Sequence, residues 1–544
     1  MALLAASVVV TALAATALLR YRPRGGDSPL QQVAKNSLFP MATSFLNKLL
    51  DMGFAVYMFR VLGAEGVGSY SFAVVVLGYL DILANFGLGT LLTREVARDR
   101  AASNLYLGNT LVLRVALWTA VLPVVALLLG PAAGSMGITP EVGLAILLLT
   151  AGLLPSLVAS TLSSLFQAYE LFEYPASVSV FTTLLKIGLQ VVALMAGWGF
   201  VGLAGVSVVV NLATVGMLAA LLRAERTRLR AEDTSSSASC VLGTAKTAAA
   251  RDSALSTQAY SGPNPQSSAA NLDLRFCWKL LCTSYPLMLN NLLNSVFFRV
   301  DSLMLLPMAG AVALGWYSTA YKFIDGLGII SSSFTLALFP LLSQYARSSR
   351  DSLTRAFGLA LKLLLVVSLP ISVGTTLIAP EIILLFAGPD YLPHAALALQ
   401  VLIWFLPFSF VNGATQYLLI AIDRQRFITL SFLIATLFNT VTNLLLIPVL
   451  GYLGAAITTV ASEWVLMIPF WHCVRRHLPP IPLARLAWRP LTASAIMGLE
   501  VWMLGDWSLP LAIALAPPIY AAALLALRSF DREERTMLEK LLRR

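Results

Sequence analysis

The sequence contains one eleven-residue pattern twice, as GAEGVGSYSFA at residues 63–73 and as GAVALGWYSTA at residues 310–320. Both copies read G-A-x-x-x-G-x-Y-S-x-A, and 247 residues separate them. At the same offset Asn47 aligns with Asn294. An apolar chain produces coincidences of Leu and Ala, but aligned Gly, Tyr and Asn point to duplication. The chain therefore consists of two homologous halves.

The composition excludes a water-soluble globule. Of 544 residues, 58% are hydrophobic and only 12% are charged, whereas soluble domains carry about 25% charged residues. At about 20 apolar residues per span, the chain has enough for about fourteen transmembrane helices. Uninterrupted apolar runs without a period of two exclude a membrane β-barrel. We therefore predict an all-α polytopic membrane protein.

Hydropathy places six predicted spans in the first half, six in the second and a final pair near the C-terminus. They run roughly over residues 36–60, 68–93, 106–130, 142–166, 174–197 and 201–222, then 280–306, 316–343, 356–379, 395–421, 427–448 and 453–474, then 489–505 and 509–528.

The connections between these spans alternate in charge, which predicts the topology. Basic residues cluster on alternate connections, at Arg94, Arg98 and Arg100, at Arg347, Arg350 and Arg355, at Arg424 and Arg426, and at Arg475 and Arg476. The intervening turns contain no Lys or Arg. By the positive-inside rule the basic side is cytoplasmic, in a cell (cytoplasmic, inner) membrane. The net charge of +10 thus reports topology, and no nucleic-acid partner is expected.

Five segments follow from this pattern. Residues 33–222 and 276–477 form the two six-helix bundles, and 478–544 form a helix pair with a cytoplasmic tail. Residues 223–275 are rich in small and polar residues and are predicted to be a disordered cytoplasmic linker. Residues 1–32 are either an additional apolar anchor or the product of a misassigned start, and the sequence leaves both open.

An even number of spans separates equivalent positions, so both halves enter the membrane from the same face. Parallel repeats of this kind are a transporter architecture. We therefore expect two bundles around a central cavity that opens alternately to each side.

The stretch RVLGAEGVGSYSFAVVVLGYLDILANFGLGTLLTREVAR at residues 60–98, with RVDSLMLLPMAGAVALGWYSTAYKF at 299–323 and ALFPLLSQYAR at 337–347, resembles a known family. It is similar to the polysaccharide-transporter branch of the multidrug/oligosaccharidyl-lipid/polysaccharide flippase superfamily, near the lipid-linked oligosaccharide flippases. The resemblance implies a V-shaped pair of bundles that moves an undecaprenyl-diphosphate-linked glycan from the cytoplasmic to the outer leaflet. It also implies glycan polymerases and glycosyltransferases as partners.

Four basic residues inside predicted spans are candidates for binding such an anion. A charge at mid-bilayer costs about 2.5–3.5 kcal/mol, so it persists where it faces water or a partner. The candidate substrate-binding residues are Lys48, Lys186, Arg299 and Lys322. Interhelical ion pairs are the alternative role for each. Arg114 and Lys362 lie close enough to helix ends to snorkel, and Arg60 lies at the outer edge.

Four acidic residues are candidates for coupling transport to a proton or sodium gradient. Asp51 follows Lys48 by three residues and Asp325 follows Lys322 by three, so each shares a helical face with its lysine. Asp81 and Glu463 have no local partner in the sequence and can change protonation state during a cycle.

Other functions find less support. The sequence has no nucleotide-binding loop, no Ser-His-Asp or Cys-His grouping, and four Cys and three His without metal-ligand spacing, so we expect no enzyme, cofactor or metal site. A membrane glycosyltransferase needs a large outer loop, and the longest, 380–394, has two acids, Glu381 and Asp390. A drug or cation antiporter of the superfamily needs an acidic cavity. A peptidoglycan-precursor (lipid II) flippase differs only in head group and remains open.

Overall fold

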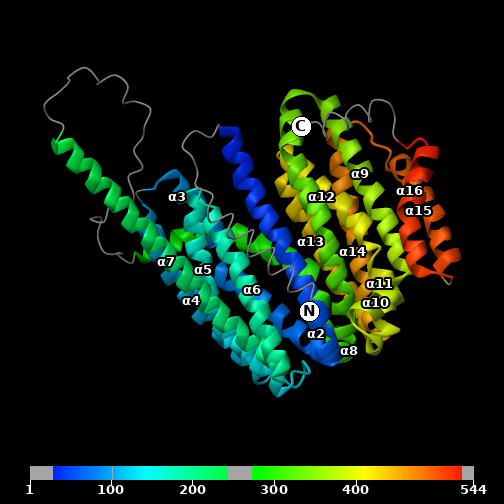
Figure 1. Cartoon of the computed structure of the whole chain (residues 1–544), viewed down its shortest axis with the longest axis horizontal. Coiled ribbons are helices and arrows are strands. Elements are labelled where there is room, and N and C mark those ends of the chain that lie inside the picture. The colour runs from blue at the N-terminus through cyan, green and yellow to red at the C-terminus, as the bar shows by residue number, and fades with distance from the viewer. Residues whose placement is uncertain (1–28, 101, 243–272, 506, 530–544) are drawn as a thin grey trace. The chain divides into compact units, whose positions relative to one another are not determined.

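The structure, a computed structural model, describes residues 29–100, 102–242, 273–505 and 507–529. Within these ranges the regular elements are all helices, which confirms the predicted all-α class (Figure 1). Predictions about residues 1–28 and about most of the linker, 243–272, concern residues outside the described ranges.

The helices match the predicted spans closely. In the first half they are α2 (Pro29–Asn85), α3 (Leu88–Arg98), α4 (Ser103–Leu129), α5 (Pro140–Ala168), α6 (Glu173–Met195) and α7 (Gly199–Leu242). In the second they are α8 (Leu274–Ser348), α9 (Arg350–Leu377), α10 (Ala379–Phe386), the 3-10 turn η1 (Pro389–Tyr391), α11 (His394–Leu402), α12 (Phe405–Ala421), α13 (Gln425–Leu450), α14 (Tyr452–His477), α15 (Leu483–Gly505) and α16 (Leu509–Ala526). Among the described residues, 11 helices are long and apolar enough to cross a membrane. The exact count of fourteen spans stays a prediction.

Two of these helices each contain two predicted spans, joined at a bend. In α2 the bend is at Gly63, with φ 65° and ψ 178°. In α8 it is at Gly310, the equivalent residue of the repeat, with φ 87° and ψ 169°. These backbone angles are accessible essentially to glycine alone. The first glycine of each motif copy therefore turns one span into the next without an intervening loop.

The chain packs into two compact units whose boundaries lie inside α2, α5 and α8 and in the turn that follows α4. Among the described residues, unit 1 comprises those up to Asp51 with Leu77–Pro131 and Gly143–Asn291. Unit 2 comprises Met52–Val76, Ala132–Val142 and the residues from Leu292 onward. The bundles proposed from the repeat, 33–222 and 276–477, do not coincide with these units. The bent region of each long helix has tertiary partners that sequence spacing does not reveal.

Helix α7 continues to Leu242, whereas the sequence predicted disorder from residue 223 onward. The prediction is therefore wrong for residues 223–242. The reason lies in the sequence RAERTRLRAED, whose Ala, Glu, Arg and Leu residues have high intrinsic helix propensity. Low hydropathy was a poor guide, because a helix that leaves the membrane needs no apolar face.

The predicted span 395–421 consists of two helices, α11 and α12, with a break at residues 403–404. Pro407 explains the break, because it has no N–H to donate to the carbonyl four residues earlier and its ring excludes that carbonyl. The preceding outer connection is not a simple loop either. It contains α10 and η1, and Tyr391 Oη donates to the Phe59 carbonyl at 3.0 Å.

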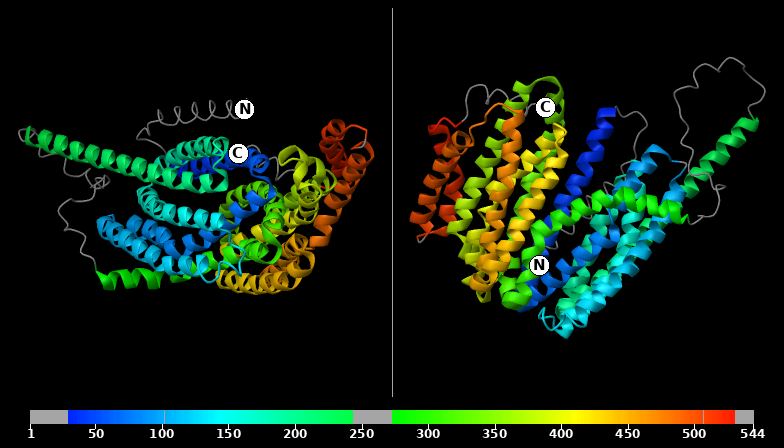
Figure 2. Two further views of the ribbon diagram at one scale, coloured as in Figure 1. Left: turned by 90° about the horizontal axis from the view of Figure 1, so that it is seen from below. Right: turned by 180° about the vertical axis from the view of Figure 1, so that it is seen from behind.

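Each unit has its own apolar core. In unit 1, Ala159, Leu162 and Phe166 of α5 pack with Val178 of α6 and Leu218 of α7. In unit 2 the main cluster joins α9, α12 and α14. The C-terminal helices α15 and α16 pack side by side, with α15 also against α9, in every view of Figures 1 and 2.

Candidate functional site

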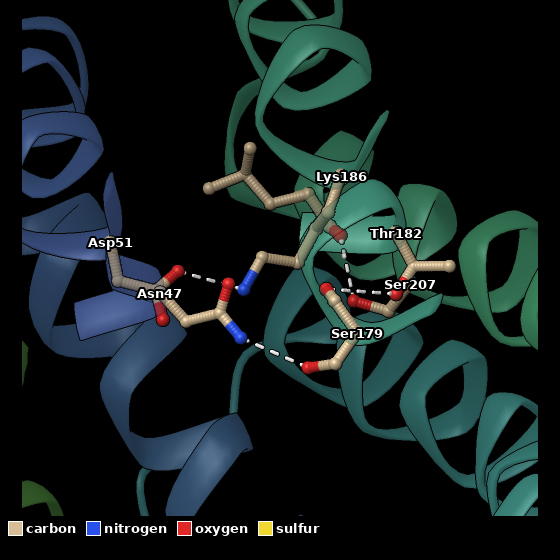
Figure 3. A network of polar contacts seen from close by, with 7 residues as sticks. Asn47, Asp51, Ser179, Thr182, Lys186 and Ser207 are labelled. Atoms are coloured by element: carbon tan, nitrogen blue, oxygen red, sulfur yellow. Dashed lines mark hydrogen bonds and ion pairs between the residues drawn. The ribbon is translucent and has the colours of Figure 1, made fainter. Parts of the chain in front are cut away.

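The polar network of unit 1 joins α2 to α6. Lys186 Nζ lies 2.9 Å from Asp51 Oδ1, and one turn earlier on α2 Asn47 Nδ2 donates to Ser179 Oγ at 2.9 Å. Asn47 and Asp51 are four residues apart, and Ser179 and Lys186 are seven apart, so each pair shares one helical face. Figure 3 shows these side chains reaching toward one another.

Unit 2 also holds an ion pair, between the two arms of α8. Arg299 Nη2 lies 3.0 Å from Asp325 Oδ2. The Arg299 Cζ atom also lies 5.1 Å from the centre of the Tyr321 ring, in a cation–π contact. The bend at Gly310 folds the second arm back along the first, which brings residues 26 positions apart into contact.

Both pairs lie far from the ends of their helix arms. Asp51 precedes the bend at Gly63 by 12 residues and Arg299 precedes that at Gly310 by 11. At about 1.5 Å per residue this is about 16–18 Å, close to the middle of a hydrocarbon core of about 30 Å. The first helix of each repeat thus carries one charged partner at a similar distance before its bend.

The two pairs are partly exposed within their units. Side-chain exposure is 33% for Lys186 and 37% for Asp51, and 41% for Arg299 and 38% for Asp325. Charges at this depth are costly against lipid, so partial exposure favours a watered or polar surface. A surface of this kind suits an anionic ligand, because Lys and Arg donate charge-assisted hydrogen bonds to phosphate oxygens.

Each of the two acids forms an ion pair with a base other than the lysine three residues before it. Lys48 is exposed and Lys322 is half-buried. The ion-pair partner that the structure gives Asp51 is Lys186, on another helix, and the one it gives Asp325 is Arg299. The pairing of each acid with the lysine three residues before it stays a prediction.

Arg114, which the sequence assigned to snorkelling, is instead buried in unit 1 with 1% exposure. Its Nη1 donates to the Leu157 carbonyl and to Thr161 Oγ1, the latter at 2.6 Å, and its Nη2 donates to Asn85 Oδ1 at 2.7 Å. Asp81 interacts electrostatically with it. The snorkelling prediction is wrong because α5 supplies acceptors that the position of Arg114 along its own helix does not reveal.

Lys362 and Arg60 also have protein surroundings. Lys362 is buried with 5% exposure and has an interaction partner, so it does not snorkel either. Arg60, predicted at the outer edge, donates from Nη2 to the Leu385 carbonyl in the last turn of α10. A cation at a helix C-terminus is favourable, which fits a structural role.

Glu463 is the most completely buried of the candidate acids, with 1% exposure in unit 2. Asn412 Nδ2 donates to Glu463 Oε2 at 2.6 Å and to its backbone carbonyl at 2.9 Å. The interaction links α12 to α14, and the group that donates to the Glu463 carboxylate is the neutral amide of Asn412. A carboxyl group in this setting can change its protonation state.

A further buried acid, Asp301, was not among the candidates. It accepts hydrogen bonds from Tyr317 Oη, from the Ser302 backbone N–H and from Thr459 Oγ1, the last at 3.1 Å. Asp301 is buried, whereas the Arg299 side chain two residues earlier on the same helix is 41% exposed. Tyr317 belongs to the repeated motif, and this is the sequence feature that could have drawn attention to Asp301. Among the described residues, no group of three or more His, Cys, Asp or Glu is placed to hold a metal ion.

Comparison with known proteins supports this architecture. The polysaccharide biosynthesis protein family model matches residues 33–346, and the MatE model matches residues 286–464. An uncharacterized membrane protein of Methanocaldococcus jannaschii is 28% identical over 183 residues, which is 33% of this chain. The match spans only 36% of that relative.

Solved structures share the fold at low sequence identity. The lipid II flippase MurJ in an inward closed conformation aligns with a TM-score of 0.68 at 13% identity, over 90% of this chain and 99% of that one. An inward-facing multidrug-resistance MATE transporter of the MOP superfamily gives 0.56 at 16%, over 81% and 95%. A MOP superfamily transporter from Pyrococcus furiosus, described as having a binding pocket of reversed polarity, gives 0.52 at 18%, over 86% and 99%.

Fold and composition thus place the chain, as a multi-pass membrane protein, in the fold class shared by the lipid II flippase MurJ and the MATE transporters of the MOP superfamily. Within it, the chain belongs to the polysaccharide biosynthesis protein family, whose model covers more than half of its length. The resemblance inferred from the sequence is therefore confirmed at the level of the superfamily and family.

Proposed function

We propose that the protein is a flippase that moves a polyprenyl-diphosphate-linked oligosaccharide from the cytoplasmic to the outer leaflet of the cell membrane by alternating access. The observation that carries this proposal is the pair of mid-depth, partly exposed bases, Lys186 and Arg299, one in each unit. The product would serve cell-surface polysaccharide synthesis, with glycosyltransferases supplying the substrate and a polymerase using the product.

In this proposal Arg299 in unit 2 and Lys186 in unit 1 each provide a group able to bind the diphosphate, and Lys48 and Lys322 add positive charge nearby in the chain. A diphosphate that leaves water loses strong hydration, and guanidinium and ammonium groups replace it with charge-assisted hydrogen bonds. The prenyl tail needs no polar partner and can stay in the bilayer.

The acids Glu463, Asp81, Asp51 and Asp325 are proposed to couple transport to a proton or sodium gradient. Glu463 is the leading candidate, since its buried side chain is held by the neutral amide of Asn412. A carboxyl group that gains and loses a cation as its surroundings change would link the gradient to the conformational cycle.

A lipid II flippase is the second candidate, because the diphosphate is common to both substrates and MurJ shares the fold. A drug antiporter is less suited, because the acids Asp51 and Asp325, which would bind an organic cation, are each already paired with a base.

The test is transport in liposomes that contain the purified full-length chain. Lipid-linked oligosaccharide, lipid II and the cation ethidium are supplied separately, and arrival on the opposite face is followed by fluorescence quenching. We expect movement of the oligosaccharide lipid. Movement of lipid II alone would favour the second candidate, and movement of ethidium alone would refute the anionic substrate.

A further inference from the structure

The two proposed anion-binding bases are already neutralised in the structure. Lys186 lies 2.9 Å from Asp51 and Arg299 lies 3.0 Å from Asp325. Each pair carries no net charge, so it presents no excess positive charge to a ligand. An anion that binds either base must compete with a carboxylate.

The pairs are of a kind that opens readily. All four side chains are between 33% and 41% exposed. Ion pairs that remain accessible to water contribute little to stability, because solvent screens the attraction and two long side chains must be held in place. Phosphate groups compete well, since guanidinium binds two of their oxygens at once.

Next to each ion pair lies a further contact that does not involve its acid. In unit 1 the hydrogen bond from Asn47 to Ser179 holds α2 against α6 next to the ion pair (Figure 3). In unit 2 the buried Tyr321 ring lies 5.1 Å from the Arg299 guanidinium. These contacts can keep the helices and the cation in position when the carboxylate leaves.

We propose that Asp51 and Asp325 are exchangeable counter-ions, each of which a diphosphate displaces from its own base, Lys186 in unit 1 or Arg299 in unit 2. The proposal rests on the proposed function, since it assumes an anionic head group. It assigns the two acids a role in specificity. A monophosphate offers fewer acceptor oxygens than a diphosphate to replace the contacts with the displaced carboxylate, so the acids favour the diphosphate.

The test measures binding to the full-length protein in lipid nanodiscs, without sugar or gradient. The probes are geranylgeranyl diphosphate and geranylgeranyl monophosphate. Wild type is expected to prefer the diphosphate. The double variant Asp51→Asn/Asp325→Asn is expected to bind the monophosphate about fivefold to tenfold more tightly and to lose most of the preference, because the competing charges are gone.

The matched control is Asp51→Glu/Asp325→Glu, which keeps both negative charges and is expected to retain the preference. Unchanged or weaker monophosphate binding by a folded Asn variant would overturn the exchange. If that variant does not fold, difference infrared spectra of wild type replace it. Added diphosphate should then alter the carboxylate stretching absorption, and an unaltered spectrum would overturn the proposal.

The outcomes separate this inference from the proposed function. If wild type binds the diphosphate but the double Asn variant binds the monophosphate no more tightly than wild type does, the exchange is refuted. The flippase proposal then still stands. Wild-type protein that binds neither probe refutes both.

Discussion

Gly68 and Gly315 occupy equivalent positions in the two motif copies, and each packs against the other copy. A Cβ atom on Gly68 would overlap the carbonyl oxygen of Ala311, and a Cβ atom on Gly315 would overlap that of Ala64. The contact is reciprocal, and both copies present the same A-x-x-x-G spacing. Small residues four apart let membrane helices approach closely. The two copies of the motif thus pack against each other where their helices cross within unit 2.

This crossing predicts that Gly68→Ala and Gly315→Ala each destabilise the protein by about 1–3 kcal/mol, the usual cost of overpacking. Backbone atoms form the opposing surface and cannot rotate away. Melting in detergent, followed by size-exclusion chromatography, measures the effect. Gly78→Ala on α2 and Gly328→Ala on α8 are matched controls, because open space surrounds both positions. Equal melting temperatures for all four variants would contradict the crossing.

The bend in α8 predicts a different effect at Gly310. An added Cβ meets no atom within 4 Å, so Gly310→Ala costs only backbone strain, about 1–3 kcal/mol for this region of φ/ψ. Gly326→Ala, in a helical part of α8 with open space around it, is the control. Thermal melting should separate the two, and a Gly310→Ala protein as stable as Gly326→Ala would show that the bend tolerates a side chain.

The sequence predicted the repeat, the all-α class and the positions of the spans, because these depend on composition and on residues compared at a fixed offset. It did not predict that Gly68 and Gly315 meet, since an alignment of two copies carries no information about contact between them. The site shows the same limit. Local spacing paired Asp51 with Lys48, whereas the base shown in contact with it lies 135 residues away on α6.

Arg114 illustrates what that limit implies for mutagenesis. Its buried guanidinium is held by Asn85, Thr161 and a backbone carbonyl. Arg114→Gln should therefore cost about 3–5 kcal/mol, the range for breaking a buried charged network. The yield of folded protein and its melting temperature measure this loss. Arg98→Gln is the control, because that side chain is 70% exposed and pairs only at the surface with Glu95. Wild-type yield and stability for Arg114→Gln would argue against a structural role.

Arg299 leads to a prediction about activity rather than stability. Arg299→Ala should abolish transport of a diphosphate-linked glycan in the liposome assay while leaving the protein folded, because its partly exposed ion pair contributes at most about 1 kcal/mol to stability. Arg299→Lys should retain part of the activity, since the charge remains but two-point binding of phosphate is lost. Arg94→Ala, a surface change at 49% exposure, serves as the control. Full transport by Arg299→Ala would rule out the assigned role.

A substitution at Glu463 tests coupling to an ion gradient separately from binding of the substrate. Glu463→Gln preserves the size of the side chain and its carbonyl oxygen can still accept from Asn412, so the fold should persist with a change in stability of no more than about 1–2 kcal/mol. The substituted amide cannot take up or release a cation at neutral pH. We therefore expect transport by this variant to lose its response to an imposed proton or sodium gradient, while binding of geranylgeranyl diphosphate stays at the wild-type level.

The paired control, Asn412→Ala, removes the hydrogen bond but keeps the carboxyl group, and its transport should still respond to the gradient. A gradient response in the Glu463→Gln protein equal to that of wild type would place the coupling acid elsewhere, with Asp81 the next residue to test.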